Sequence, residues 1–150
     1  MPPQSVMKYI LYFLAFSFIF ASCKRNDDQD DDNPNLIYPI VNINLNLDLP
    51  EYSGLNFPGN SVILEQLGVR GVVVYNVNND LYTAFDLADP NHLPNSCSTM
   101  DLEGIIASCP CTTDSNTYDI VTGQHQSQPS TYPMQRYNAV RTGNAVRISN

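Results

Sequence analysis

Apolar and polar residues alternate along much of this chain in the manner of β-strands. Every second residue from 41 to 49 is apolar, which predicts a strand with one buried face. Other apolar runs between turn-forming residues predict further strands at 61–66, 70–77, 81–86, 104–108, 136–141 and 145–149. We find no helical periodicity beyond residue 36, so the pattern predicts an all-β domain.

The residues between these runs indicate turns and loops. Residues 78–80 (Asn-Asn-Asp) are expected to close one hairpin, and residues 142–144 (Thr-Gly-Asn) a second one near the C-terminus. Residues 57–60 (Phe-Pro-Gly-Asn) have the chemistry of a turn. Residues 87–100 and 112–132 lack a regular pattern, and we expect long loops there.

The first 22 residues have the pattern of a signal peptide. Lys8 supplies a positive charge, and the apolar run at 9–20, interrupted by Ser17, is too short to span a bilayer comfortably. Two small residues then precede Cys23, which resembles a bacterial lipoprotein signal cut before a lipid-bearing cysteine. The alternatives are an ordinary signal peptide or an anchor helix. We expect lipid on Cys23 to hold the chain to a membrane of the bacterial envelope, the outer membrane (periplasmic or surface-exposed) in preference to the inner one.

Residues 23–35 are predicted to form a flexible acidic tether. Residues 24–34 hold five of the 15 acidic residues and no apolar residue to bury, so ordering them would not offset the lost entropy. An acid-rich stretch after a lipid-bearing cysteine also resembles the surface-export signals of some lipoproteins, and plain solubility explains it equally well.

Residues 36–150 are predicted to form one domain. A domain of 115 residues buries roughly two thirds of its unfolded surface. It carries ten acidic residues against four scattered arginines, for a net charge of −6. This balance offers no basic patch, so nucleic acid is not an expected partner.

Three cysteines lie in two short segments of the domain. Residues 89–97 are Asp-Pro-Asn-His-Leu-Pro-Asn-Ser-Cys, and residues 109–112 are Cys-Pro-Cys-Thr. With the flanking hairpin and the Pro-containing tail, these segments resemble the two loops of a Rieske iron–sulfur domain over about residues 61–150. In that family one iron of a [2Fe–2S] cluster takes two thiolates and the other takes two imidazoles. The resemblance implies an antiparallel β-sandwich with a small two-loop subdomain.

The resemblance also assigns residues to positions of the family's site. It makes Cys109 a cluster ligand and His92 a plausible one, although His92 lies three residues after Asp89 where two are usual. Asp89 replaces the other ligand cysteine, and Thr112 replaces the other ligand histidine. A hydroxyl is a poor ligand for iron, and a carboxylate would change the electronics of the cluster. The resemblance therefore argues for the fold and against the cluster.

The pairing of the cysteines has two candidate solutions. The resemblance implies a disulfide between Cys97 and Cys111, and a bond between Cys97 and Cys109 is the alternative. A direct bond from Cys109 to Cys111 would close a strained ring. With the implied pairing, Cys109 is either an inert buried thiol or a metal ligand together with His92 and Asp89. His125 lies in a polar segment and is predicted to be a solvated turn residue.

Three functions are compatible with these residues, and we expect them in the following order of preference. The first is a binding or structural module of the envelope, without a cofactor and with an unknown protein partner. The second is electron transfer by a [2Fe–2S] cluster with unusual ligands, and the third is a mononuclear metal site. No enzyme is expected, because the chain shows neither a nucleophile elbow nor a Gly-rich phosphate loop.

Overall fold

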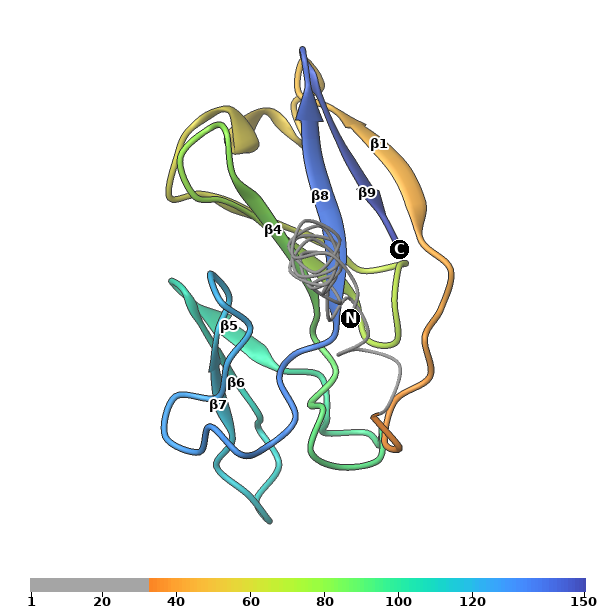
Figure 1. The fold of residues 1–150 in the computed structure, drawn as a ribbon, viewed down its shortest axis with the longest axis vertical. Helices are drawn as coiled ribbons and strands as arrows, with labels where there is room; N and C mark the ends of the chain where they lie inside the picture. The colour runs from red at the N-terminus through yellow and green to blue at the C-terminus, as the bar shows by residue number, and fades with distance from the viewer. Residues whose placement is uncertain (1–32) are drawn as a thin grey trace, which may run out of the picture.

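The computed structural model describes residues 33–150, which form two antiparallel sheets and one 3-10 turn (Figure 1). The all-β fold class expected from the sequence is confirmed. The predicted signal peptide, Cys23 and most of the predicted tether lie outside the described residues. Within residues 33–150, no helix is long and apolar enough to cross a membrane.

The larger sheet has six strands in the order β1-β9-β8-β4-β3-β2. Its halves, β1-β9-β8 and β4-β3-β2, are joined by only two residue pairs between β4 and β8. One buried cluster combines Leu45 and Val146 from the first half with Val72 and Val74 from the second. The halves therefore face each other across a common core, as the layers of a sandwich do. The strands are β1 (Asn42–Asn46), β2 (Ser61–Leu64), β3 (Val72–Asn76), β4 (Tyr82–Asp86), β8 (Arg136–Thr142) and β9 (Ala145–Ser149).

Strands β3 and β4 are buried on both faces. Val72, Val74 and Ala84 belong to the core of the larger sheet, whereas Val73 and Phe85 belong to a second apolar cluster. Successive side chains of a strand point to opposite faces, so the unbroken apolar run in β3 serves two cores at once. These strands therefore belong to the sandwich and also form the base of the second cluster.

The second cluster lies between this base and a small sheet in the order β5-β6-β7, drawn at the lower left of Figure 1. A first loop (residues 87–100) connects β4 to β5, and a second loop (residues 109–116) connects β6 to β7. Because Ser108 pairs with both Asp101 and Thr117, both loops emerge at the same edge of this sheet. The expected two-loop subdomain is thus confirmed. Its strands are β5 (Asp101–Glu103), β6 (Ile106–Ser108) and β7 (Thr117–Asp119).

Some predicted boundaries differ from the observed ones. The predicted strand over 41–49 ends at Asn46, because a turn follows, although Leu47 remains only 1% exposed. Strand β5 and the 3-10 turn η1 (Ser53–Asn56) have only three and four residues, too few for a recognisable pattern, and were not predicted. The side-chain amides of Asn33 and Asn35 donate to the carbonyl of Pro90, so contacts with the first loop begin before residue 36.

Candidate metal centre

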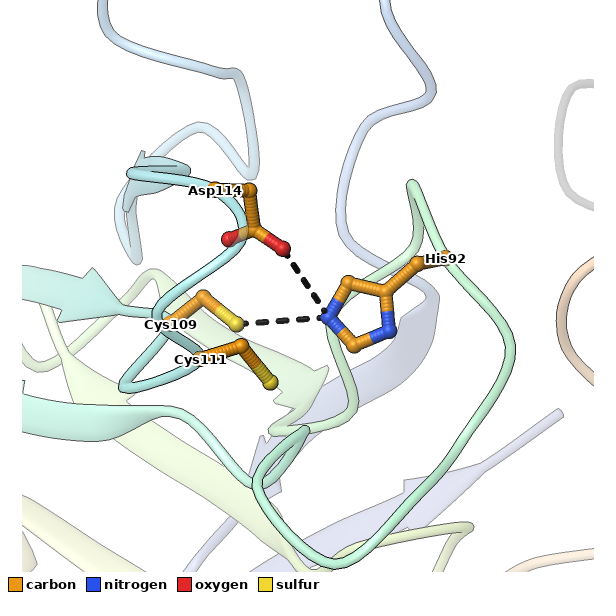
Figure 2. A group of neighbouring side chains, drawn as sticks. All are labelled: His92, Cys109, Cys111 and Asp114. Carbon is orange, nitrogen blue, oxygen red and sulfur yellow. Dashed lines mark hydrogen bonds and ion pairs between the residues drawn. The ribbon is translucent and has the colours of Figure 1, made fainter.

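The tips of the two loops bring together four side chains with metal-binding atoms, shown in Figure 2: His92 from the first loop, and Cys109, Cys111 and Asp114 from the second. One ligand-type atom from each lies within 4.8 Å of the others. Nε2 of His92 is 3.3 Å from Sγ of Cys109 and 3.5 Å from Oδ2 of Asp114. The structure therefore places the predicted His92 and Cys109 in direct contact.

The position of the His92 ring leaves one nitrogen for the site. Nδ1 lies 3.0 Å from the carbonyl oxygen of Leu93, which can only accept a hydrogen bond. This contact puts the ring proton on Nδ1 and turns the Nε2 lone pair toward the other loop. Nε2 then faces a thiol and two carboxylates, since Oδ2 of Asp89 also lies at 3.4 Å. The Cys109 thiol has one proton to share among these lone pairs, and a metal ion could take the place of that proton.

The electrostatics of the second loop also favour a bound cation at this position. Burial, together with the nearby carboxylates of Asp89 and Asp114, raises the pKa of the Cys109 thiol to about 12. Oδ1 of Asp114 is buried and makes no hydrogen bond with the described residues. A bound cation would satisfy this oxygen and deprotonate the thiol. Asp114 was missed at the sequence level, because the family pattern directs attention to Thr112.

Asp89 lies beside these groups but is occupied by hydrogen bonds. It is fully buried, and its carboxylate accepts from the backbone N–H of Asn91, the side-chain amide of Asn116 and the hydroxyl of Tyr118. Burial alone would raise the pKa of Asp89, but these donors outweigh it and hold the pKa below its ordinary value. Asp89 therefore connects the first loop to the second loop and β7, and supplies negative charge next to His92.

A disulfide joins Cys97 to Cys111, the pairing that the family resemblance implied. It connects the first loop to the second. Cys109 is the free cysteine of the described residues and is buried. A disulfide sulfur has no proton to lose, so Cys111 is not available as a thiolate while the bond is intact.

The two remaining sequence candidates lie outside this group. Thr112, at the family's histidine position, is solvent-exposed. His125 is buried, at 7% exposure, and packs edge-on against Tyr118, so the prediction of a solvated turn residue was wrong. Its Nδ1 accepts from two backbone N–H groups, of Ser127 and Gln128, and its Nε2 lies 3.3 Å from Oδ1 of Asn116. Both ring nitrogens of His125 are thus occupied, Nδ1 within its own turn and Nε2 by Asn116 of the second loop.

These residues do not fit a [2Fe–2S] cluster of the Rieske kind. That cluster requires two thiolates and two imidazoles, whereas the loops offer one free thiol and one free imidazole. The replaced positions do not compensate, since Thr112 is exposed and the Asp89 carboxylate already accepts three hydrogen bonds. The donors that do converge are one nitrogen, one sulfur and one oxygen, a set suited to a single borderline metal ion.

Solved structures similar to this chain include ferredoxins. A structure described as the complex of reduced oxygenase and oxidised ferredoxin in carbazole 1,9a-dioxygenase matches 73% of this chain and 92% of its own, with 19% identity and a TM-score of 0.46. A ferredoxin of Sphingomonas yanoikuyae B1 matches 63% and 88%, with 22% identity and a TM-score of 0.42. A ferredoxin of carbazole 1,9a-dioxygenase from Nocardioides aromaticivorans IC177 matches 62% and 86%, with 20% identity and a TM-score of 0.41. No protein-family model and no curated protein matches the chain.

Proposed function

We propose that this protein is a lipid-anchored, Rieske-like envelope protein whose two loops bind one mononuclear metal ion of the zinc type. The ligands are His92, Cys109 and Asp114, and the role is binding rather than catalysis. The contact of His92 Nε2 with both a buried thiol and a carboxylate carries this proposal.

The distances agree with a tetrahedral zinc site. Zinc bond lengths put a coordinating sulfur and nitrogen about 3.6 Å apart, and a nitrogen and oxygen about 3.4 Å apart. The corresponding separations here are 3.3 Å from His92 to Cys109 and 3.5 Å from His92 to Asp114. The two separations that involve His92 therefore need to change by only a few tenths of an ångström, and the ligand atoms of Cys109 and Asp114 lie within 4.8 Å of each other.

Three features support a binding role in the envelope. The N-terminal pattern supports lipid attachment at Cys23 and a place at the outer membrane. The disulfide suits an exported protein, since such bonds persist in oxidising compartments. The site lies at the loop tips, where the side chains of His92 and Asp114 are 21% and 22% exposed, so an ion and a protein partner can reach it.

The test is zinc binding by the full chain, purified in detergent, measured by competition with a chromophoric chelator. We expect one zinc per chain, and a loss of more than about 100-fold in affinity for His92→Ala and for Cys109→Ser, since even outer-shell changes commonly cost 10–100-fold. Asp101→Ala, which removes an exposed carboxylate of β5, is the matched control and should bind as the wild type does.

Iron and acid-labile sulfide are measured on the same samples after anaerobic reconstitution. Two irons and two sulfides per chain, with visible absorption, would replace this proposal by electron transfer. A folded chain that binds neither zinc nor iron would leave a metal-free binding module stapled by its disulfide.

A further inference from the structure

The fourth member of the loop-tip group is Cys111. Its Sγ lies within 4.8 Å of the ligand atoms of His92, Cys109 and Asp114. The three proposed ligands leave one position of a tetrahedral ion open. Only the bond to Cys97 keeps a second sulfur from taking that position.

We infer that Cys111 is a reduction-dependent fourth ligand, so that opening the Cys97–Cys111 disulfide converts a three-ligand site into a closed Cys-Cys-His-Asp site. This inference rests on the proposed metal-binding function and assigns that site its regulation. Cys111 needs only a short movement to reach the ion, because its sulfur lies within 4.8 Å of each of the other donor atoms.

The chemistry balances with a dithiol as the reductant. Its thiolate attacks Sγ of Cys97, which is partly exposed, rather than Sγ of Cys111, whose residue is 4% exposed. The S–S bond breaks, and Cys111 leaves as a thiolate directed at the metal position. The second thiol of the reductant then displaces Cys97, which departs as a thiol, and the reductant becomes a disulfide. Two electrons pass from the dithiol to the protein, and the metal ion keeps its oxidation state.

The exchange replaces the disulfide cross-link between the two loops by a cross-link through the metal ion. In the oxidised state Cys97 connects the first loop to Cys111. In the reduced, metal-bound state His92 connects the same loop to three ligands of the second. The metal ion therefore stabilises the reduced protein more than the oxidised one, because it is bound more tightly there.

Two single variants separate the effect of the ligand from that of the disulfide. Cys97→Ser and Cys111→Ser both lack the bond, but only Cys97→Ser leaves the Cys111 thiol at the site. We expect Cys97→Ser, without any reductant, to bind zinc more than about 100-fold more tightly than Cys111→Ser, since a direct ligand should exceed the 10–100-fold of an outer-shell partner. The wild-type full chain treated with a dithiol should match Cys97→Ser.

Cobalt serves as the second readout, because thiolate-to-cobalt charge-transfer absorption reports the number of bound sulfurs. Cys97→Ser should show the absorption of two thiolates, and Cys111→Ser and the oxidised wild type that of one. Equal zinc affinity and equal cobalt absorption in the two variants would overturn the inference while leaving the three-ligand site intact. Loss of zinc binding in every form, including the oxidised wild type, would overturn the proposed function as well.

Discussion

Two fully buried carboxylates, Asp86 and Asp89, lie three residues apart but serve different regions. Asp86 ends β4 and accepts hydrogen bonds from the backbone N–H groups of Val69, Arg70 and Ala88 and from the hydroxyl of Tyr137. Asp89 lies in the first loop and accepts mainly from side chains beyond its own loop. The Asp86 carboxylate thus stabilises the backbone of the folded chain. The Asp89 carboxylate orients side chains next to His92, where it can contribute to a binding site.

The pKa shifts of the two carboxyl groups have opposite directions. Burial raises the pKa of Asp86, even though its four donors act to lower it. For Asp89 the donors prevail over burial, and the pKa falls below its ordinary value. Asp89 is thus kept charged beside His92, where a negative charge favours a cation. The first loop thus keeps the negative charge of Asp89 near the candidate ligands, whereas the Asp86 carboxylate of β4 serves only hydrogen bonds within the fold.

The largest effect is expected for Asp86→Ala. This change leaves three backbone N–H groups and the Tyr137 hydroxyl without an acceptor, and each buried unsatisfied donor costs about 1–3 kcal/mol. We expect the free energy of unfolding, from denaturant titration, to fall by roughly 3–5 kcal/mol. Zinc affinity of the folded protein should not change, because Asp86 touches none of the proposed ligands.

A second variant tests the role of Asp86 by displacing its carboxylate instead of removing it. A Cβ at Gly68, where φ is +71°, would overlap Oδ2 of Asp86, so Gly68→Ala should also destabilise the protein. The matched control is Gly143→Ala, which has a similar φ of +60° but open space around it. A loss in Gly68→Ala no greater than in Gly143→Ala would contradict the role given to Asp86.

A smaller effect on stability, but a clear effect on binding, is expected for Asp89→Ala. The donors that it frees include the side chains of Asn116 and Tyr118, of which Asn116 is only partly buried and can turn toward water. We expect a loss of about 1–3 kcal/mol in the free energy of unfolding. Chelator competition should show zinc affinity reduced by roughly 10–100-fold, the usual cost of losing an outer-shell partner.

If Asp89→Ala leaves the zinc affinity unchanged, Asp89 has only a structural role, as Asp86 does. The proposed difference between the two carboxylates would then be wrong. Tyr118→Phe is the control, because it deletes one donor to Asp89 and keeps the charge. It should bind zinc more tightly than Asp89→Ala does.

The strands were predictable from the sequence because their pattern follows burial. In β1 and β9 alternate residues enter one core, and in β3 the continuous run of Val72–Val74 serves two. The ends of the predicted β1 strand were less predictable, because Leu47 stays buried after the pairing of β1 has ended. The alternation of buried residues therefore extends beyond the last residue of the hydrogen-bonded strand.

The site was predicted in part, for a physical reason. His92 and Cys109 were predictable from the two cysteine-containing segments. Asp114 was not, because its place at the site depends on the path of the second loop, which exposes Thr112 and brings Asp114 to the other ligands. His125 was misjudged because polar neighbours flank it, while its burial comes from Tyr118 and a turn at Gly123 that packs against Phe85. Contacts between loops leave no local pattern in the sequence.

The smallest effect is a pH dependence that separates the two carboxylates. A carboxyl group whose pKa is raised on folding stabilises the protein fully below its unfolded pKa, about 3.9, and this contribution is lost as the pH rises through the folded pKa. The cost of Asp86→Ala should therefore be greatest below about pH 4 and shrink toward pH 7, by about 1.4 kcal/mol for each unit by which folding raises the pKa. Denaturant titrations of wild type and variant from pH 3 to pH 7 measure this difference. A cost that grows with pH would mean that the four donors prevail over burial at Asp86, and the two carboxylates would then differ only in their partners.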